Sequence, residues 1–404
     1  MEVCVVAKVS SASRRNLIAA IWSSIACLAM LQPVTVDANP PPVASPPYAI
    51  SVFATAPAGL SGPDSITFDL TNIFVGYGNG GAPDGSGGAM SNIVKYDLRG
   101  NKLNNFVITG HNDGLRYNPA TGKLWALQNE DGNSNLAIID PNSGRQQVYQ
   151  LGTGPHGGGY DDIAFESLGF GRGFGRGFGR GFGFGDNDLS FQAFFSASAP
   201  TLTTNTAPAI VLAKIFGKKV LLTGILNGDA TATDVTTGKP VTLNLLDPDS
   251  MIFDPRGELV LDSQGDGLLV IVQHPGLACQ NNLVVPLTST DGGSTVGNTQ
   301  LDDTIFATQT SGQVLVADKG ANTIYSITVP YFAPDATYSA VSVFHNPSDP
   351  SPFESFVGQT NLTTGFVTQI VTGMSAPGGM AFVPSDLNFA SLVRSSERKA
   401  RPCP

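Results

Sequence analysis

Five aspartates stand at the start of short apolar runs that are rich in strand-forming residues. They are Asp64, Asp113, Asp162, Asp249 and Asp303. Carboxylate oxygens are the ligands that hard divalent cations prefer, and carboxylates gathered without a cation repel one another, which raises their pKa values. Each aspartate could instead cap its own turn by accepting a backbone hydrogen bond. The choice depends on whether the elements that carry the five aspartates bring them together.

The segments around these aspartates are copies of one loose repeat. Each copy has one or two small or acidic residues, a short alternating strand, usually a Gly or Asn turn, and a second apolar strand. The six copies begin with "GPDSITF" (62–68), "HNDGLRY" (111–117), "GYDDIAF" (159–165), "DPDSMIF" (247–253), "LDDTIFA" (301–307) and "APGGMAF" (376–382). Units of about forty to fifty residues, each with a few strands, are typical of β-propeller blades.

The composition agrees with a turn-rich, all-β chain. Of 404 residues, 47 are Gly and 28 are Pro, and only 13% are charged, which is the profile of many short strands joined by turns. We therefore predict an all-β, six-bladed β-propeller. Seven blades is the alternative, because the intervals 162–249 and 303–379 are each longer than one blade. The N-terminal "PYAISVFATA" (47–56) is expected to supply an outer strand that closes the ring.

The chain divides into four predicted segments, which are an export signal (1–38), a proline-rich linker (39–47), the propeller (48–385) and a basic tail (386–404). Arg14 and Arg15 precede a short apolar run, and a small-residue cleavage point follows near Ala38. We favour a general secretory signal, with a twin-arginine signal and an uncleaved anchor as alternatives. The expected location is secreted or periplasmic, with no membrane attachment after cleavage.

A low-complexity insertion, "GFGRGFGRGFGRGFGFG", occupies residues 169–185. Gly/Arg/aromatic repeats can bind nucleic acid, because Arg pairs with phosphate and the rings stack on bases. The insertion has only three arginines, however, and the formal net charge of the chain is -10. We therefore interpret it as a disordered loop of the third blade, between "DDIAFE" and "FQAFFSASAP", and expect no nucleic-acid partner.

Two cysteines remain if the signal is removed, namely Cys279 and Cys403. In an exported chain they could form one disulfide that ties the tail to the fourth blade. Two unpaired thiols is the alternative.

The predicted fold brings the aspartates to one place. The strand that opens each repeat of a propeller is usually innermost and lines a central channel. The residues just before this strand form the mouth of the channel, so the five aspartates are expected to converge there with Asn112 beside them. His111 and His156 also precede inner-strand copies, and each is either a base or metal ligand at the mouth or a solvated loop histidine.

Two segments resemble those of a known family. "NDGLRYNPATGKLWA" looks like the "NDG…DP.G..W" segment of gluconolactonase-like and regucalcin-like six-bladed propellers, and "DPDSMIFDPRGELVL" is similar to their "PDGM…D..G.LWV" segment. The resemblance implies a divalent ion at the top of the channel that polarises a sugar lactone for hydrolysis. By motif, Asp249 matches a ligand aspartate of the family, and Asn112 with Asp113 matches its NDG pair.

The sequence also departs from this family. Ser65 and Ser250 replace the Gly that follows the family's aspartate, its SNG asparagine has no clear match, and Asp64 at best replaces its glutamate. Repeats of the NHL type, many of which are plain binding platforms, fit almost as well.

Two functions from different classes therefore stand. We favour an exported binding platform whose acidic channel mouth takes a small-molecule, glycan or protein ligand, and we expect a monomer. The alternative is a lactonase or esterase that depends on a divalent cation, calcium or zinc. The metal ligands would be Asp64, Asn112, Asp162, Asp249 and Asp303, and the catalytic groups would be Asp113, His111 and His156.

Overall fold

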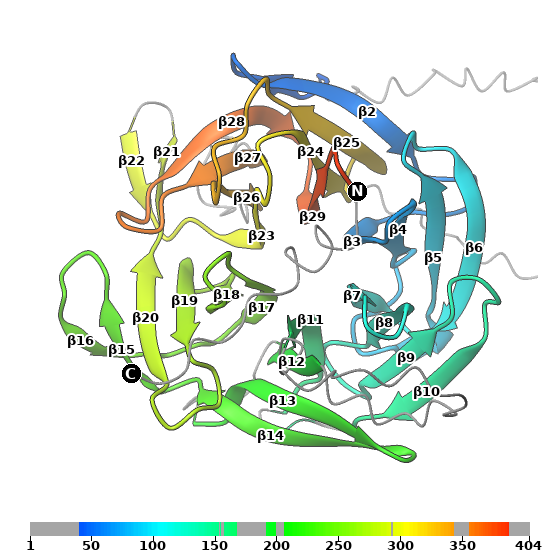
Figure 1. Ribbon diagram of the computed structural model, residues 1–404, viewed down its shortest axis with the longest axis horizontal. Coiled ribbons are helices and arrows are strands. Elements are labelled where there is room, and N and C mark those ends of the chain that lie inside the picture. The colour runs from blue at the N-terminus through cyan, green and yellow to red at the C-terminus, as the bar shows by residue number, and fades with distance from the viewer. Residues whose placement is uncertain are drawn as a thin grey trace, which may run out of the picture. The chain divides into compact units, whose positions relative to one another are not determined.

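The structure is a computed structural model that describes residues 40–152, 154, 157–167, 191–198, 206–291, 294–342 and 355–387 (Figure 1). The predicted export signal, the insertion 169–185, His156 and most of the basic tail lie outside these residues. No helix within the described residues is long and apolar enough to cross a membrane.

The described residues form six β-sheets around a central axis, as the repeat predicted (Figure 1). Blade one contains β3 (Pro63–Phe68), β4 (Asn72–Tyr77), β5 (Met90–Asp97) and β6 (Lys102–Thr109). Blade two contains β7 (Asn112–Asn118), β8 (Lys123–Gln128), β9 (Asn135–Ile139) and β10 (Gln146–Gln150). Blade three contains β11 (Tyr160–Ser167), β12 (Phe191–Ala197), β13 (Pro208–Phe216) and β14 (Lys219–Asn227).

The other three blades take strands from more distant parts of the chain. Blade four contains β17 (Pro248–Phe253), β18 (Leu259–Ser263), β19 (Leu268–Gln273), β20 (Asn281–Pro286), β15 (Thr231–Asp234) and β16 (Pro240–Thr242). Blade five contains β23 (Leu301–Phe306), β26 (Thr337–Val341), β27 (Ser355–Thr360), β28 (Val367–Met374) and β1 (Val43–Ala44). Blade six contains β29 (Pro377–Pro384), β24 (Gly312–Asp318), β25 (Thr323–Thr328) and β2 (Ala49–Thr55). A hairpin of β21 (Thr288–Asp291) and β22 (Ser294–Gly297) lies outside the blades.

The innermost strands form a closed ring in the order β3, β7, β11, β17, β23 and β29, and β29 lies against β3. The N-terminal β2 pairs with β25 as the outermost strand of blade six, which confirms the predicted closing strand. Residues 43–44, inside the segment expected to be a linker, form β1 and pair with β28. The ring is thus sealed by strands from both ends of the described chain.

Blades five and six are interleaved, which corrects one part of the repeat assignment. The copy that begins at Leu301 was expected to supply consecutive strands of one blade, but β23 pairs with β26 and β24 pairs with β29. The connection 307–311 reads "ATQTS" and lacks the Asp or Gly that turns the chain back after β3, β7 and β17. The chain therefore crosses to blade six and returns for β26, which accounts for the long interval 303–379.

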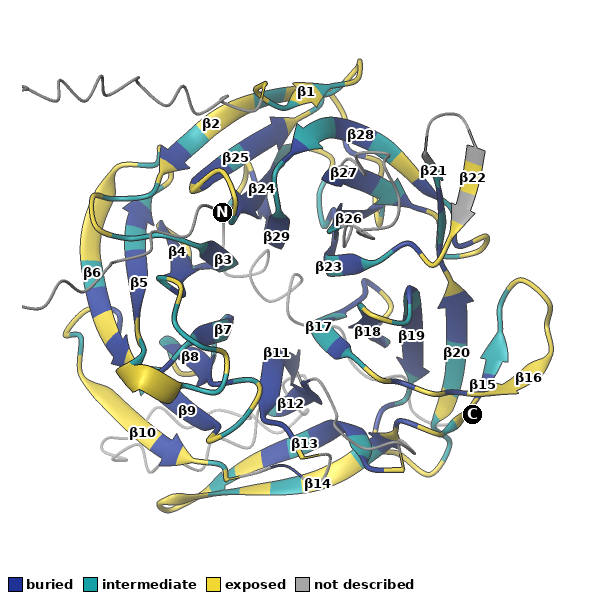
Figure 2. Cartoon of the chain, turned by 180° about the vertical axis from the view of Figure 1, so that it is seen from behind, coloured by how far each residue is buried: buried dark blue, intermediate teal, exposed yellow. Residues whose placement is uncertain are grey.

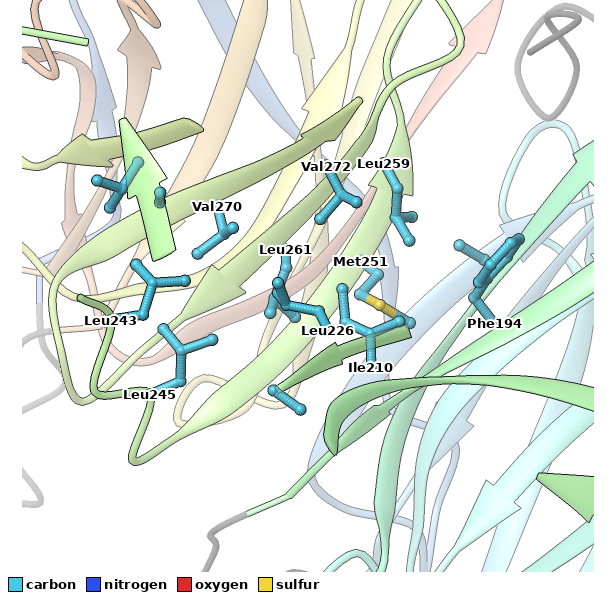
Figure 3. Packing of buried hydrophobic residues seen from close by; sticks show 14 of the residues in the cluster. Phe194, Ile210, Leu226, Leu243, Leu245, Met251, Leu259, Leu261, Val270 and Val272 are labelled. Atoms are coloured by element: carbon cyan, nitrogen blue, oxygen red, sulfur yellow. The ribbon is translucent and has the colours of Figure 1, made fainter. Parts of the chain in front are cut away.

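The hydrophobic core lies between neighbouring blades. Figure 2 shows that the inner strands are largely buried and that exposed residues gather on the outermost strands. Between blades three and four, Phe194 and Ile210 pack with Met251, Leu259 and other apolar side chains (Figure 3). Each sheet buries both faces against its neighbours, so second strands such as β4 ("NIFVGY") and β8 ("KLWALQ") are nearly continuous apolar runs.

Every innermost strand carries one bulge at the same place. In blade two, for example, Asn112 pairs with Gln128 and Leu115 pairs with Ala126, so that Asp113 and Gly114 together face one residue. The same register shift occurs in the other five blades. A bulge re-aims side chains, and here the first residue of each pair is aimed at the channel while the second faces the next blade.

The second bulge position requires glycine in blade two. A Cβ on Gly114 would lie 2.2 Å from the backbone oxygen of Asp161 and 2.8 Å from the Cα of Asp162, both in blade three. Gly379 of blade six is packed equally closely, because its Cβ would lie 2.6 Å from the backbone oxygen of Asp64.

We predict that Gly114→Ala lowers the free energy of unfolding by about 1–3 kcal/mol, because the backbone of the neighbouring blade must move. Urea unfolding of the two proteins measures the difference. Gly297→Ala is the matched control, since its Cβ would meet nothing within 4 Å, and it should change the value by less than about 0.5 kcal/mol. Equal effects of both substitutions would contradict the close approach of blades two and three.

Candidate functional site

The first bulge residues of the six blades form one end of the channel. They are Asp64, Asp113, Asp161, Asp249, Asp302 and Gly378. We call the five aspartates of this set the channel mouth. Five blades therefore contribute one carboxylate each, and blade six contributes none.

Lysine compensates part of this negative charge. Lys319, which follows β24, places its Nζ 2.9 Å from Asp64 Oδ2 and 3.5 Å from Asp302 Oδ1. Gly378 leaves room for this side chain, because a Cβ there would lie 2.6 Å from Lys319 Cε. Burial acts to raise the pKa of Asp64, but the charge and hydrogen bond of Lys319, the hydrogen bond with Asp113 and the charge of His111 together outweigh it, and the pKa is lowered. This half of the mouth is a buried ion-pair network.

The other half of the mouth has no such partner. One carboxylate oxygen each from Asp113, Asp161 and Asp249 lie within 4.8 Å of one another. Among the described residues, no Lys, Arg or His nitrogen forms an ion pair with these three. Burial, together with the neighbouring carboxylates, raises the pKa of all three well above its usual range. Bound protons or a cation can relieve this repulsion.

His111 lies at the rim of the mouth and is already engaged. Its Nδ1 lies 3.0 Å from Glu130 Oε2, and its Nε2 lies against Gly78, where a Cβ would be only 2.6 Å away. Burial acts to lower the pKa of His111, but the hydrogen bond and charge of Glu130 and the charge of Asp64 raise it. Glu130 therefore fixes the orientation of the His111 ring at the rim.

Two of the aspartates predicted from sequence are not among the mouth residues. Asp162 accepts a hydrogen bond from Met251 N at 3.0 Å and pairs with Arg116 Nη2 at 2.5 Å. Asp303 accepts from Met380 N at 2.6 Å. Both occupy the second bulge position, so the sequence assignment was one residue too far along in these two blades, where the sequence reads Asp-Asp.

Asn112 is also placed away from the mouth. Its side chain is buried between blades one and two, where Nδ2 donates to Leu127 O at 2.9 Å and Oδ1 points at Gly76 of β4. Asp64, Asp113 and Asp249 do lie at the mouth. His156 lies outside the described residues, and the metal-binding and catalytic roles predicted for all these side chains remain predictions.

Sequence reasoning missed Asp161, Asp302, Lys319 and Glu130. The first two were hidden only by the choice within each Asp-Asp pair. Lys319 lies in the turn after β24 of an interleaved blade, and nothing in the local pattern around it signals an inward direction.

Arg116 closes the channel below the mouth. Besides Asp162, its guanidinium donates from Nε to Ile163 O at 3.0 Å and from Nη2 to Met251 O at 3.1 Å. One side chain of blade two thus binds blades three and four. Burial acts to lower the pKa of Arg116, but the charges of Asp162 and Asp303 raise it.

The chain has little detectable similarity to known proteins. No protein-family model matches the chain, and no curated protein matches it in sequence. A crystal structure of a protein from Lactobacillus plantarum covers 80% of this chain and 88% of its own length, at 12% identity and a TM-score of 0.37. The WD40 domain of Toxoplasma gondii coronin covers 82% of this chain and 77% of its own length, at 12% identity and a TM-score of 0.31. At these identities and TM-scores, neither similarity supports a conclusion about this chain. The six-bladed assignment depends on the strand pairing.

We predict that Arg116→Met lowers the free energy of unfolding by about 3–5 kcal/mol, because Asp162 is left as a buried charge without its partner. Arg256→Met is the control: this side chain also bridges two carboxylates, Asp254 and Glu258, but is 52% exposed. Its loss should cost only about 0–1 kcal/mol. Chemical denaturation measures both, and a small effect of Arg116→Met would show that Asp162 does not depend on it.

We predict that Asp161→Asn stabilises the protein at about pH 7.5, by roughly 1–3 kcal/mol, which corresponds to about one to two pKa units of relieved repulsion. When folding raises the pKa of a carboxyl, that carboxyl contributes its full stabilisation of the folded state at pH values below its pKa in the unfolded chain. The contribution is lost as the pH rises through its pKa in the folded protein. Burial also raises the pKa of Asp303 to about 7. In cation-free buffer the wild-type protein should therefore lose stability between about pH 5 and pH 7.5, and Asp161→Asn should lose less.

Thermal unfolding at the two pH values measures this difference. Lys319→Gln is the opposing control, because it removes the compensating charge and should lower the unfolding temperature at the higher pH. If Asp161→Asn destabilises the protein at both pH values, the three carboxylates do not repel one another.

Proposed function

We propose that this protein is an exported, non-catalytic binding propeller whose channel mouth holds a positively charged group through Asp113, Asp161 and Asp249. The proposal is carried by the uneven way in which positive charge is distributed among the five aspartates of the mouth. Lys319 forms ion pairs with Asp64 and Asp302, whereas the three remaining carboxylates form no ion pair with a cationic side chain among the described residues.

The side chains present fit two sources of positive charge. Oxygens that lie within 4.8 Å of one another can surround an ion at about 2.3–2.6 Å from each, the distance range of calcium. The same three carboxylates can accept hydrogen bonds from an ammonium group. A divalent cation held at the mouth, or the amine of a small-molecule, glycan or protein ligand, would supply the same charge.

Further acids around the mouth would draw such a group inward. Asp247 is half-buried beside the mouth, and burial raises its pKa. Glu130 lies at the rim, and the formal net charge of the whole chain is -10. A concave surface lined by one sign of charge concentrates ions of the opposite sign, which favours a cationic ligand and disfavours nucleic acid.

Binding is favoured over hydrolysis by the chemistry of the site. Hydrolysis would require a base that can accept a proton from water, and Nε2 of His111, the ring nitrogen that Glu130 does not engage, packs against Gly78. Cys279 is disulfide-bonded, which supports an oxidising, exported location.

We predict that calcium binds the full chain with a measurable heat in isothermal titration calorimetry at about pH 7.5, where ion binding displaces the protons of the carboxyls into the buffer, and that Asp161→Asn lowers the affinity at least about tenfold. Zinc is titrated separately. Asp140→Asn is the matched control, because Asp140 lies in an exposed turn where it caps Asn142 and Ser143, and it should leave binding unchanged.

The source of the charge is decided by a second titration with a lysine-rich peptide in metal-free buffer. Heat with calcium or zinc alone assigns a resident ion, and heat with the peptide alone assigns the ligand's own amine. No heat in any titration, or equal heats for wild type and Asp161→Asn, would overturn the proposal.

A further inference from the structure

Two cavities lie toward the end of the propeller opposite the mouth. The first, of about 100 Å³, lies in the channel beside Arg116, and each blade contributes one aromatic residue to it. These residues are Phe68, Tyr117, Phe165, Phe253, Phe306 and Phe382. The second cavity, of about 590 Å³, is formed by blades four and five, and we call it the side pocket. Its volume is within the range of about 300–1,000 Å³ that is usual for small-molecule sites.

Blade five supplies most of the wall of the side pocket. Thr337, where β26 begins, pairs with Phe306 at the end of β23 and with Thr360 at the end of β27. These strand ends therefore lie side by side at the far end of the blade. Blade four adds the turn 254–256, which follows β17. Pro255 and Phe306 line both cavities, so the side pocket has an apolar wall where it meets the channel.

A hydroxyl of blade five faces the side pocket without a partner. Thr337 lines the pocket and is only 4% exposed, and no described residue forms a hydrogen bond with its Oγ1. This oxygen is not among the fully enclosed polar atoms of the described chain, so it is accessible from the pocket. The neighbouring Thr360 differs, because its Oγ1 bonds Ser339 Oγ at 2.7 Å. A polar group in so buried a place is expected to have a partner, and a ligand in the pocket would supply one.

Two amide side chains turn N–H donors toward the same space. Asn361 Oδ1 accepts hydrogen bonds from Thr363 N at 2.9 Å and Thr364 N at 3.2 Å, and Gln359 Oε1 accepts one from Tyr48 OH at 3.3 Å. Both residues line the pocket. Their oxygens are thus used within the protein, whereas their amide nitrogens have no partner in the described part of the chain.

A guanidinium and a carboxylate complete the polar lining. Arg256 Nε lies 2.8 Å from Asp254 Oδ2 and its Nη2 lies 3.0 Å from Glu258 Oε2, which leaves Nη1 without a partner among the described residues. The exposed carboxylate of Asp335 likewise has no hydrogen-bond partner there. Burial acts to lower the pKa of Arg256, but the hydrogen bond and charge of Asp254 and the charges of Glu258 and Asp335 raise it. Asp335 and Arg256 therefore share one space.

This set of groups suits a neutral ligand with many hydroxyls. The acids in and around the pocket outnumber Arg256, which disfavours an anion. Only Asp335 has a free carboxylate, and the guanidinium near it disfavours a cation. A hydroxyl can accept a hydrogen bond from an amide N–H and donate one to a carboxylate at the same time, and the C–H faces of a sugar ring can pack on Pro255 and Phe306.

We propose that the side pocket binds a neutral saccharide. Asp335 accepts a hydrogen bond from one sugar hydroxyl, Arg256 and Asn361 donate to others, and the Thr337 hydroxyl binds the ligand on the buried side of the pocket. This site is separate from the channel mouth and does not depend on the function proposed for the mouth.

Saturation-transfer NMR of the full chain tests the site with glucose, galactose, mannose, N-acetylglucosamine, maltose, cellobiose and lactose. At least one sugar should receive saturation. Thr337→Val removes the hydroxyl and nearly keeps the shape, and Asp335→Asn removes the charge with a residue that tolerates the φ of 62° at this position. Each should weaken the binding of that sugar at least about fivefold, because one hydrogen bond is lost.

Asp140→Asn is the matched control, because Asp140 lies in an exposed turn of blade two, and it should leave sugar binding unchanged. Saturation of none of the seven sugars, or unchanged binding in both pocket variants, would overturn the proposal. Loss of sugar binding in Asp161→Asn would place the saccharide at the mouth and also overturn it. A preference for glucuronate or glucosamine over glucose would show that the pocket selects a charged ligand instead.

Discussion

The extra residue in each innermost strand is the constraint on which both the ring and its mouth depend. An unbulged strand would alternate its side chains between two faces, but the bulge presents two successive residues in different directions. Because the six strands surround one axis, the first residues meet at the channel, although they come from positions 64 to 378. The second residues join neighbouring blades: Ser250 Oγ donates to Asp302 O at 2.8 Å, Ser65 Oγ donates to Asp113 O, and Asp162 and Asp303 accept from the backbone of the next blade.

The distribution of positive charge then decides what the mouth can do. Blade six has Gly378 where the others have aspartate, and the free space is taken by Lys319 from the turn after the neighbouring strand β24. If every blade contributed both an aspartate and a cationic side chain, each carboxylate would have its own ion-pair partner and the mouth would serve only to hold the blades together. Because the ion pairs of Lys319 in the described part of the chain are with Asp64 and Asp302, the other three carboxylates keep raised pKa values, an arrangement that costs stability and leaves charge available for a ligand.

Arg116 divides the channel into two chemically different ends. Above it are buried carboxylates, and below it is an aromatic cavity with a residue from every blade. Its hydrogen bonds to Asp162, Ile163 and Met251 hold blades two, three and four at the axis.

The sequence by itself determined the class of fold, the six innermost strands and the outer closing strand, because alternating apolar runs and their repetition are local patterns. It also identified Asp64, Asp113 and Asp249 as residues of the mouth. Only the tertiary structure decided between the members of each Asp-Asp pair, because a bulge breaks the alternation that sequence reading relies on and places Asp161 and Asp302 inward. The interleaving of blades five and six, the inward reach of Lys319 and the burial of Asn112 were likewise decided by contacts between strands that are distant in sequence, for which no local pattern exists.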